Sequence, residues 1–469
     1  MLGKIKGKLL FQYYRFLGWC ARCYLQRHQI FTIGINGSVG KTSCRMIIYQ
    51  TLKKALPELN IYTSPKNFNG ELGMSLSIFQ VEEWVPSVWN MIKAGSQIFC
   101  KALFGKKAYD MIVLEYGIDR PKEMEFLLSI NKPNIGVFTA IDAVHSEQFG
   151  SPADIAEEEV KMVKNTREAV FLNRDDAYAK QVCDRIGVDV LTYTTSGMAG
   201  VDLSFENETI EEKQGEKSEF LISFDAQIKD KHYAVQTNLI GKPNYAYLTL
   251  GLAIAQICVW KFTGGELNME EFLSEPLIYQ LQPGRCSIFS GKEGSLIVDS
   301  TYNSSPLSMR KLIDTTLQIQ KSLRERRKVM LVLGDMRELG DLTEQEHRLL
   351  AGYVHQSADQ ICLVGESMDK YLLDELEKTG VEKSTVKTEK IVKNSECGLW
   401  TFSRGQMRSG LFSLKEVRIP FSLKKQGSKS WQIKRMLSIG QGKARGGWRR
   451  SLICIIKNSI YKGKKLTQI

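Results

Sequence analysis

The residues from Gly37 to Ser43 have the composition of a loop that binds phosphate. They read Gly37-Ser38-Val39-Gly40-Lys41-Thr42-Ser43 and stand between an apolar run at 30–35 and a helical pattern of apolar residues. A strand, a glycine-rich turn and a helix in this order direct backbone N–H groups and the positive end of the helix at an anion. Lys41 would neutralise phosphate charge, and Thr42 would offer its hydroxyl to Mg²⁺. The strict pattern has glycine at position 35, where this chain has Ile35, so the prediction depends on the strand–loop–helix context.

Two further residues follow apolar segments that predict strands. Glu115 comes directly after 111–114, and His145, one of five histidines, comes after 135–139. Open α/β sheets bind ligands at the carboxyl ends of their strands, which makes both residues candidates for a site. From residue type alone, Glu115 could equally be a surface acid and His145 a structural histidine.

Short apolar strands alternate with helical segments from residue 30 to about 283, a pattern typical of a mainly parallel sheet. Within this range we predict a hairpin at 200–240 and an apolar helix at 241–262. Pro283-Gly284 is a plausible hinge, and a second α/β unit follows at 284–396. The fold class is therefore α/β, with a central P-loop ATPase domain (30–283) and a smaller C-terminal α/β domain (284–396).

Residues 1–29 contain six basic residues and no acidic one. Leu10, Tyr13, Leu17, Cys20 and Tyr24 fall at helical spacing, which predicts a basic amphipathic helix. Two alternatives stay open: the helix packs on the domain that follows, or it contacts an anionic membrane surface. No second cysteine or histidine pair lies at metal spacing from Cys20 and Cys23, so we predict reduced cysteines in a cytoplasmic protein.

The net charge of +12 comes from one segment. Residues 397–469 hold 17 basic residues and one acid, Glu416, whereas the remaining chain holds 47 basic and 51 acidic residues. A basic protein suggests nucleic-acid binding, but here the excess lies outside both predicted domains. We therefore predict no nucleic-acid partner.

Seven segments, in order and spacing, together resemble the Mur ligase family. They are 37–43, 64–73 (SPKNFNGELG), 114–117 (LEYG), 139–147 (TAIDAVHSE), 283–285 (PGR), 299–306 (DSTYNSSP) and 333–340 (LGDMRELG). The resemblance covers about 30–396, and the segments at 64–73 and 333–340 favour the member that adds D-alanyl-D-alanine to a muramoyl-tripeptide precursor. It implies that ATP binds between the two domains and phosphorylates a carboxylate, and that an amine then attacks the acyl phosphate.

The resemblance also implies a role for each matching residue. It implies that Lys41 and Arg285 contact phosphates, that Asp299 lies at the ribose, and that Tyr302 and Asn303 lie beside the nucleoside. Mg²⁺ would be bound by Thr42, Glu115 and His145. The implied contacts to the precursor are Lys66, Asn67 and Asn69, and those to the incoming amine are Asp335, Arg337 and Glu338.

The chain departs from the family at three places. The family often has a lysine, carbamylated in some members, where this chain has Glu159, which would be either a metal ligand in its place or a solvated charge. Ala140 replaces a usual asparagine. About 30 residues precede the phosphate loop, too few for the family's uridine-nucleotide domain, so we expect that domain to be lacking.

The family's closing segment, resembling Leu-Val-Lys-Gly-Ser, is not found in the printed sequence. Near Cys397 the composition becomes basic, and three of the seven tryptophans lie beyond it. Residues 411–426 can be encoded by a DNA that reads ILVKGSQNTIFLEEA two bases later. We hypothesise that 397–469 is an out-of-frame translation, and expect it to be poorly ordered and unable to complete the C-terminal sheet.

The predicted function is an ATP-dependent amide ligase, with ATP and Mg²⁺ as cofactors, that joins D-alanyl-D-alanine to a muramoyl-peptide precursor. The alternatives are a related ligase with another acceptor, of polyglutamate or cyanophycin type, and a catalytically inactive nucleotide-binding homologue. We expect a cytoplasmic monomer, with peripheral contact to the inner face of the membrane through the N-terminal helix as the sharper alternative.

Overall fold

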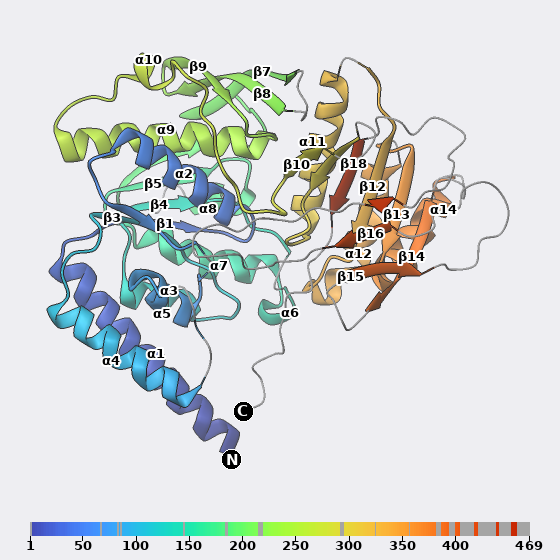
Figure 1. Cartoon of the computed structure of the whole chain (residues 1–469). Helices are drawn as coiled ribbons and strands as arrows, with labels where there is room; N and C mark the ends of the chain where they lie inside the picture. Colours follow the sequence, from blue (N-terminus) through green and yellow to red (C-terminus); the bar gives the residue numbers. More distant parts are fainter. Residues whose placement is uncertain are drawn as a thin grey trace.

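The computed structural model contains two α/β domains that lie side by side (Figure 1). A cleft between them is lined by residues of both. The structure describes residues 2–456 except for several short segments and most of the basic tail. The gaps are 66–67, 82–83, 85–86, 144–145, 183–185, 214–218, 291–294, 324, 356, 381–385, 394–398, 404–416, 421–437 and 440–451.

The central domain is built on a sheet with the order β2-β3-β1-β4-β5-β6-β7-β8-β9. Its first seven strands pair in parallel, and β7, β8 and β9 pair antiparallel. The strands are β1 (Phe31–Asn36), β2 (Ile61–Thr63), β3 (Met111–Glu115), β4 (Ile135–Phe138), β5 (Ala169–Asn173), β6 (Asp189–Tyr193), β7 (Leu203–Lys213), β8 (Glu219–Ile228) and β9 (Lys231–Thr237). The predicted parallel sheet is confirmed, and the predicted hairpin extends it at one edge.

Helices cover both faces of this sheet, because alternate residues of each parallel strand are apolar on opposite sides. Ile33 and Val113 face the core beneath α2 (Lys41–Ala55) and α9 (Lys242–Thr263), whereas Ile112 and Leu114 face the other core. The remaining helices of this domain are α3 (Glu71–Ile78), α5 (Glu123–Ile130), α6 (Ser146–Phe149), α7 (Pro152–Lys164), α8 (Ala177–Val182) and α10 (Met269–Phe272).

The helix α9 is long and apolar enough to cross a membrane, and it is the one such helix among the residues described. Two-thirds of its most apolar window is buried inside the protein, where it packs against α2 and the β7–β8 pair. Its apolar composition is therefore explained by its place in the core.

Two further long helices lie side by side at the edge of the central domain (Figure 1). The first, α1 (Leu2–Arg27), buries Leu17, Cys20 and Tyr24 against the domain, which confirms that the N-terminal helix packs there. The second, α4 (Val88–Phe104), was not predicted. Cys20 and Cys23 are free thiols on α1, and the described residues contain no group of three or more metal-ligating side chains.

The C-terminal domain has a sheet with the order β10-β11-β18-β12-β13-β14-β15-β16-β17. Its strands are β10 (Ser287–Ser290), β11 (Leu296–Asp299), β12 (Val329–Gly334), β13 (Gln360–Val364), β14 (Val386–Lys393), β15 (Leu399–Ser403), β16 (Val417–Pro420), β17 (Ser438–Ile439) and β18 (Leu452–Ile456). The helices are α11 (Pro306–Ser322), η3 (Gly340–Leu342), α12 (Thr343–Leu349), α13 (Ala351–Val354), η4 (Met368–Leu372) and α14 (Leu373–Lys378). Residues 343–354 form two helices in place of one, since α12 ends at Leu349 and α13 begins at Ala351.

The basic tail contributes a strand to this sheet. Leu452–Ile456 pairs in parallel with β11 on one side and β12 on the other. The expectation that the tail cannot complete the sheet is therefore wrong: the segment LICII is apolar and β-branched enough to fill a buried central position. Most of the tail lies outside the described residues, so the expectation that the tail is poorly ordered stays a prediction.

Candidate active site

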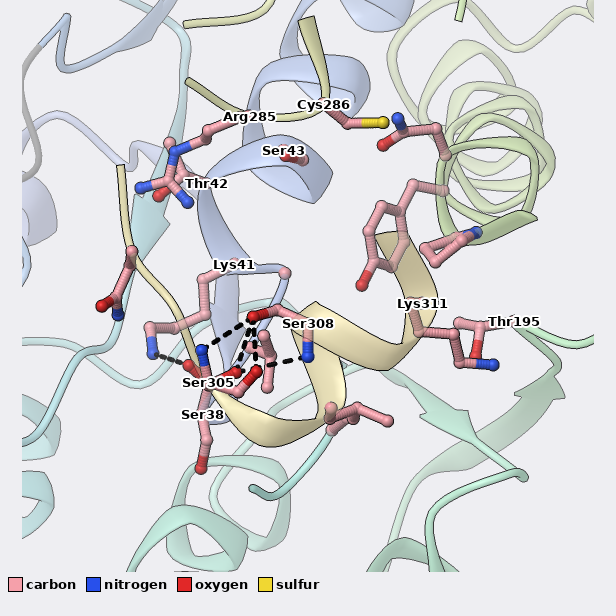
Figure 2. Close-up of a pocket in the computed structure, with 18 of the residues that line it drawn as sticks. Ser38, Lys41, Thr42, Ser43, Thr195, Arg285, Cys286, Ser305, Ser308 and Lys311 are labelled. Carbon is pink, nitrogen blue, oxygen red and sulfur yellow. Dashed lines mark hydrogen bonds between the residues drawn. The ribbon is translucent and has the colours of Figure 1, made fainter. Parts of the chain in front are cut away.

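A cleft of about 660 Å³ lies where the carboxyl ends of the central strands face the C-terminal domain. The phosphate loop forms one wall, Arg285 and Cys286 lie above it, and the first turns of α11 form the opposite wall (Figure 2). The cleft therefore takes side chains from both domains.

The conformation of the phosphate loop depends on two glycines. Gly37 and Gly40 have φ values of 118° and 88°, which strain other residues. A side chain at Gly40 would begin 2.0 Å from the hydroxyl of Tyr247 on α9. The amide of Ser38 donates to the carbonyl of Ala140 at 2.7 Å, which holds the loop against the end of β4.

The helix α2 begins at Lys41, and no side chain in the described part of the structure caps its N-terminus. Its first backbone N–H groups and the residues from Gly40 to Ser43 line the cleft, which is the arrangement that attracts a phosphate. The ammonium group of Lys41 donates to the carbonyl of Gly37 and, at 3.3 Å, to that of Ser38. The predicted strand–loop–helix arrangement is confirmed.

Glu115 stands at the end of β3, next to the phosphate loop, and is buried. Its carboxylate forms an ion pair with Arg45, where Nε lies 2.7 Å from Oε1. Arg45 is buried one turn into α2, and its guanidinium also donates to the hydroxyl of Thr63 at 2.9 Å. Both partners are thereby taken out of water, and Glu115 still lines the cleft.

Arg285 enters the cleft from the hinge between the domains. Its guanidinium stacks on Tyr302, 4.1 Å from the ring centroid. Burial lowers the pKa of Arg285, and the negative charge of Glu115 acts in the opposite direction. Its Nε is buried and has no hydrogen-bond partner among the described residues.

Comparison with known proteins identifies the family. Residues 35–255 match the Mur ligase middle domain, and residues 284–395 match the glutamate ligase domain of Mur ligases. The chain belongs to the Mur ligase family.

Curated relatives include UDP-N-acetylmuramoyl-tripeptide--D-alanyl-D-alanine ligases from Borreliella burgdorferi and Bacillus subtilis. The first is 28% identical over 336 residues, which are 71% of this chain and 62% of that protein. The second is 25% identical and covers 70% of this chain and 61% of that protein. The chain thus spans about 60% of their length.

The MurF ligase from Thermotoga maritima, solved in complex with ADP, has the same fold. It aligns with a TM-score of 0.58 and 22% identity over 80% of this chain and 74% of its own. A MurF from Acinetobacter baumannii aligns with a TM-score of 0.58 and 19% identity, covering 79% of this chain and 70% of its own.

In this Mur ligase the cleft holds many of the residues predicted for nucleotide and metal binding, and also Asn69, which is predicted to contact the precursor. They are Ser38, Val39, Gly40, Lys41, Thr42, Ser43, Asn69, Glu115, Arg285, Tyr302 and Asn303. Asp299 is buried at the end of β11 behind this wall, and burial raises its pKa. Lys66, Asn67 and His145 lie outside the described residues.

Glu159 does not line the cleft. It is buried on α7, and its Oε2 accepts from the Asn36 side-chain amide at 3.0 Å and from the Gly37 backbone at 3.3 Å. The alternative of a solvated charge is therefore wrong. Glu159 supports the phosphate loop from behind, at the residue where β1 ends.

Asp335, Arg337 and Glu338 lie on the loop after β12, away from the cleft lining. Asp335 accepts from the Met368 amide at 2.9 Å. The buried His347 accepts from the Met336 amide at 3.2 Å through Nε2, and burial lowers its pKa, which favours the neutral ring that this bond requires. The contact of this loop with the amine substrate stays a prediction.

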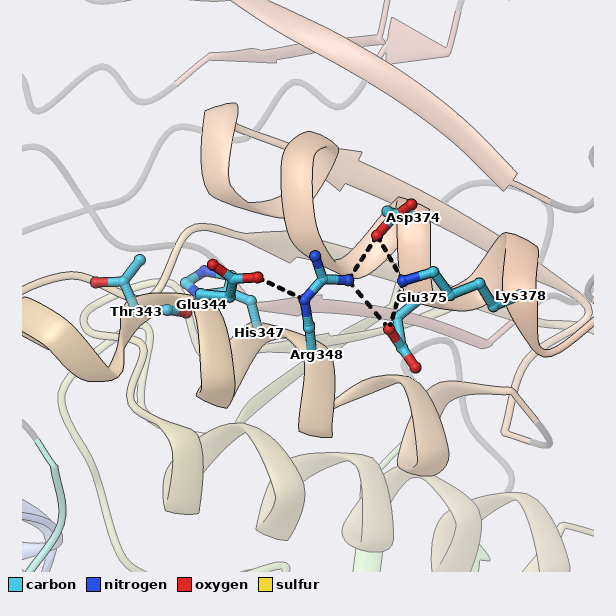
Figure 3. Close-up of polar contacts among 7 residues, drawn as sticks. All are labelled: Thr343, Glu344, His347, Arg348, Asp374, Glu375 and Lys378. Carbon is cyan, nitrogen blue, oxygen red and sulfur yellow. Dashed lines mark hydrogen bonds and ion pairs between the residues drawn. The ribbon is translucent and has the colours of Figure 1, made fainter.

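The helix that carries His347 is fixed to α14 by charge pairs (Figure 3). Arg348 contacts Glu344 at 2.9 Å, Asp374 at 2.6 Å and Glu375 at 3.1 Å, and Lys378 contacts Asp374 at 2.9 Å. These partly exposed pairs contribute little energy individually. Together they orient α12, and with it the loop that His347 holds.

Sequence reasoning missed three groups of residues in the cleft. They are Asn173, Asp175 and Asp176 at and just after the end of β5; Asn244 and Tyr247 on α9; and Ser308, Lys311 and Thr315 on α11. The rule that selected Glu115, a polar residue directly after a buried strand, also points to Asn173. The α11 residues give no such signal, because they reach the cleft only through the arrangement of the two domains.

Asp142 links these domains. Its carboxylate, after β4, accepts from the Leu307 amide at the start of α11 at 3.0 Å and from the Ala143 amide at 2.8 Å. It also bonds to the Ser305 side chain, and burial raises its pKa. The Asp142 carboxylate lies at the N-terminus of α11, and the N-terminus of a helix favours a negatively charged group.

We expect Asp142→Asn to change how stability depends on pH. Burial raises the folded-state pKa of Asp142, so wild-type stability falls as the pH rises from its unfolded pKa through its folded pKa. Asn keeps an acceptor and lacks this titration. The unfolding free energy of the variant minus that of the wild type should therefore rise across that interval and then level off, as measured by urea denaturation.

Asp142→Ala serves as the comparison, because it removes the acceptor as well as the charge. It should be about 1–3 kcal/mol less stable than Asp142→Asn. A free-energy difference between Asp142→Asn and wild type that is constant with pH would contradict the role assigned to this carboxylate.

Proposed function

We propose that this Mur ligase is an ATP-dependent amide ligase that adds D-alanyl-D-alanine to a muramoyl-tripeptide precursor. The observation that carries the proposal is the meeting of Lys41, Glu115 and Arg285 in one cleft between two domains. The names of the curated relatives support the choice of substrates.

The proposed reaction has two steps. An oxygen of the precursor carboxylate attacks the γ-phosphorus of ATP, forming an acyl phosphate and releasing ADP. The amine of D-alanyl-D-alanine then attacks the acyl carbon, loses a proton, and forms the amide as phosphate leaves. The protein aligns the reactants and neutralises charge rather than forming covalent bonds to them.

The positive groups of the cleft fit this task. Lys41 and the N-terminus of α2 would contact the β- and γ-phosphates, and Arg285 would reach them from the hinge. Asp299 would lie at the ribose, with Tyr302 and Asn303 beside the nucleoside. Because Arg285 already stacks on Tyr302, a nucleotide there would contact a preformed pair.

The donors of the cleft also fit Mg²⁺, which would stabilise the charge that develops on the transferred phosphoryl group. Mg²⁺ prefers oxygen ligands and is usually bound by one or two carboxylates together with substrate phosphates. Thr42 and Glu115 supply such oxygens at the cleft wall. We assign Mg²⁺ to Thr42, Glu115 and His145, and give Glu159 the supporting role described above in place of metal binding.

The substrates would enter from two sides of the nucleotide. Asn69 lines the cleft beside Glu115 and, with Lys66 and Asn67, would contact the precursor. Asp335, Arg337 and Glu338 would contact the amine. We further propose that the enzyme is a cytoplasmic monomer.

Two alternatives remain distinct in their chemistry. A related ligase of polyglutamate or cyanophycin type would release phosphate with a different acceptor. An inactive homologue would bind ATP without releasing phosphate. Phosphate release from ATP, measured with each substrate alone and with both, separates the three: only the proposed enzyme requires a muramoyl-tripeptide and D-alanyl-D-alanine together.

Lys41→Ala should reduce this phosphate release by at least ~100-fold, because it removes a preorganised charge beside the transferred phosphoryl group. Lys53→Ala, an exposed lysine on the same helix, is the matched control and should retain activity. Retained turnover in a folded Lys41→Ala protein would rule out the phosphate-loop assignment.

Glu115→Gln should raise the Mg²⁺ concentration needed for half-maximal phosphate release, as should His145→Ala. The Gln variant also leaves Arg45 buried without its counter-charge, which costs about 3–5 kcal/mol, so Glu115→Asp, which keeps the charge, is measured beside it. Glu125→Gln, an exposed acid on α5, is the control. An unchanged Mg²⁺ dependence in folded variants would exclude that residue as a ligand.

We also propose that residues 397–469 are an out-of-frame translation. The family match ends at residue 395, next to the change in composition. Read in frame, the segment containing Val-Lys-Gly-Ser would supply an apolar strand to the C-terminal sheet. In the described structure, β18 of the tail occupies a central position of that sheet, between β11 and β12.

Resequencing the gene tests this directly. The codons for 411–426 should encode Leu-Val-Lys-Gly-Ser in a neighbouring frame. If no neighbouring frame contains that segment, the tail belongs to the protein as printed, and the proposal is wrong.

A further inference from the structure

The outer sides of α1 and α4 form an apolar surface that nothing in the described structure covers. The described residues have 17 exposed large hydrophobic side chains, and ten of them lie on these two helices. We call these ten the α1–α4 surface: Leu9, Leu10, Phe11, Phe16, Trp19, Val88, Trp89, Ile92, Phe99 and Phe104. Such a concentration marks an interaction site rather than scattered exposure.

The α1–α4 surface has a defined structure, because direct contacts hold the two helices together. Phe99 stacks on Phe16 and on Trp19, with ring centroids 6.0 and 6.4 Å apart. The Tyr13 hydroxyl donates to the Met91 carbonyl at 2.8 Å, and Arg27 donates to the carbonyls of Leu103 and Gly105 at the end of α4.

Packing on the domain does not require these exposed side chains, because a different side of α1 makes that contact. Leu17, Cys20, Ala21 and Tyr24 already pack α1 against the domain. The exposed fraction of Trp89 is 76% and that of Phe104 is 80%, so the two ends of α4 project into solvent.

The charge carried by the two helices themselves has one sign. Residues 1–29 and 88–108 contain no Asp or Glu. The exposed charged side chains there include Arg15, Arg22, Lys93, Lys101 and Lys106. Exposed aromatic residues interleaved with basic ones on a helix pair match a bilayer interface that carries negative charge.

We propose that the α1–α4 surface docks on an anionic phospholipid bilayer. Its apolar side chains enter the interface and its basic residues contact the lipid phosphates. Figure 1 shows both helices at the edge of the central domain, on the side away from the C-terminal domain. The cleft therefore stays open when the protein is docked. This inference does not depend on the proposed reaction.

The test uses the full chain and co-sedimentation with vesicles. The protein should bind vesicles containing phosphatidylglycerol and lose binding on vesicles of phosphatidylcholine alone, and added salt should weaken it. Trp89→Glu combined with Phe104→Glu should weaken binding about tenfold or more, because it removes two apolar anchors and adds repulsion. Trp260→Glu changes a tryptophan on α9 that is also largely exposed; it is the matched control and should bind as wild type.

A second measurement detects insertion itself. Brominated phosphatidylglycerol should quench tryptophan fluorescence of the wild type more than that of the Trp89→Glu, Phe104→Glu variant. All substituted residues are exposed, so unchanged thermal melting establishes that the variants are folded. Failure to bind anionic vesicles, equal loss in the Trp260→Glu control, or a concentration-dependent dimer that these variants abolish would overturn the proposal; the last would identify a second copy as the occupant.

Discussion

The buried ion pair between Arg45 and Glu115 is the interaction on which the cleft depends. Two arginines, Arg45 and Arg285, and one carboxylate are removed from water within the same region, at the ends of α2 and β3 and at the hinge. Buried charges are costly unless paired and hydrogen-bonded, and Arg285 is buried beside this pair with no ion pair of its own among the described residues. An anionic ligand would supply negative charge beside the buried guanidinium groups. The burial of these arginines, which is costly for the fold, would therefore favour binding of a polyphosphate.

The phosphate loop is also fixed in position, by hydrogen bonds on the side away from the cleft. Ala140 accepts from the loop amide of Ser38, and Glu159 accepts from Asn36 and Gly37. These contacts leave the amides at the start of α2 directed to the cleft. The opposite wall is set by Asp142, which fixes the N-terminus of α11 across the domain boundary. Preorganised groups cost little reorganisation when charge develops, provided both walls are positioned at once.

Much of the fold followed from periodicity, but the exceptions have physical causes. The helix α9 agrees with the predicted helix at 241–262 because its apolar run is bounded by polar turns. The helix α4 was not predicted, although its apolar and polar residues do segregate at helical spacing; five of its large apolar side chains are exposed instead of packing in the core. In the site, Glu115 could be predicted from its place after a strand. Its partner Arg45 could not, since their pairing arises only when α2 packs beside β3.

The sequence left two alternatives open for the N-terminal helix, packing on the domain and contact with a membrane surface, and they concern different sides of the helix. Its inner residues Leu17, Cys20 and Tyr24 belong to the core beneath the sheet, so removing the helix would uncover apolar surface of the central domain. Its outer residues, with those of α4, remain exposed. A helix committed only to packing would gain stability and solubility from polar residues on that outer face, and here aromatic and basic residues stand in their place. The docking that we propose would account for the composition of the outer face, and the packing of the inner face would fix how the docked protein orients the cleft.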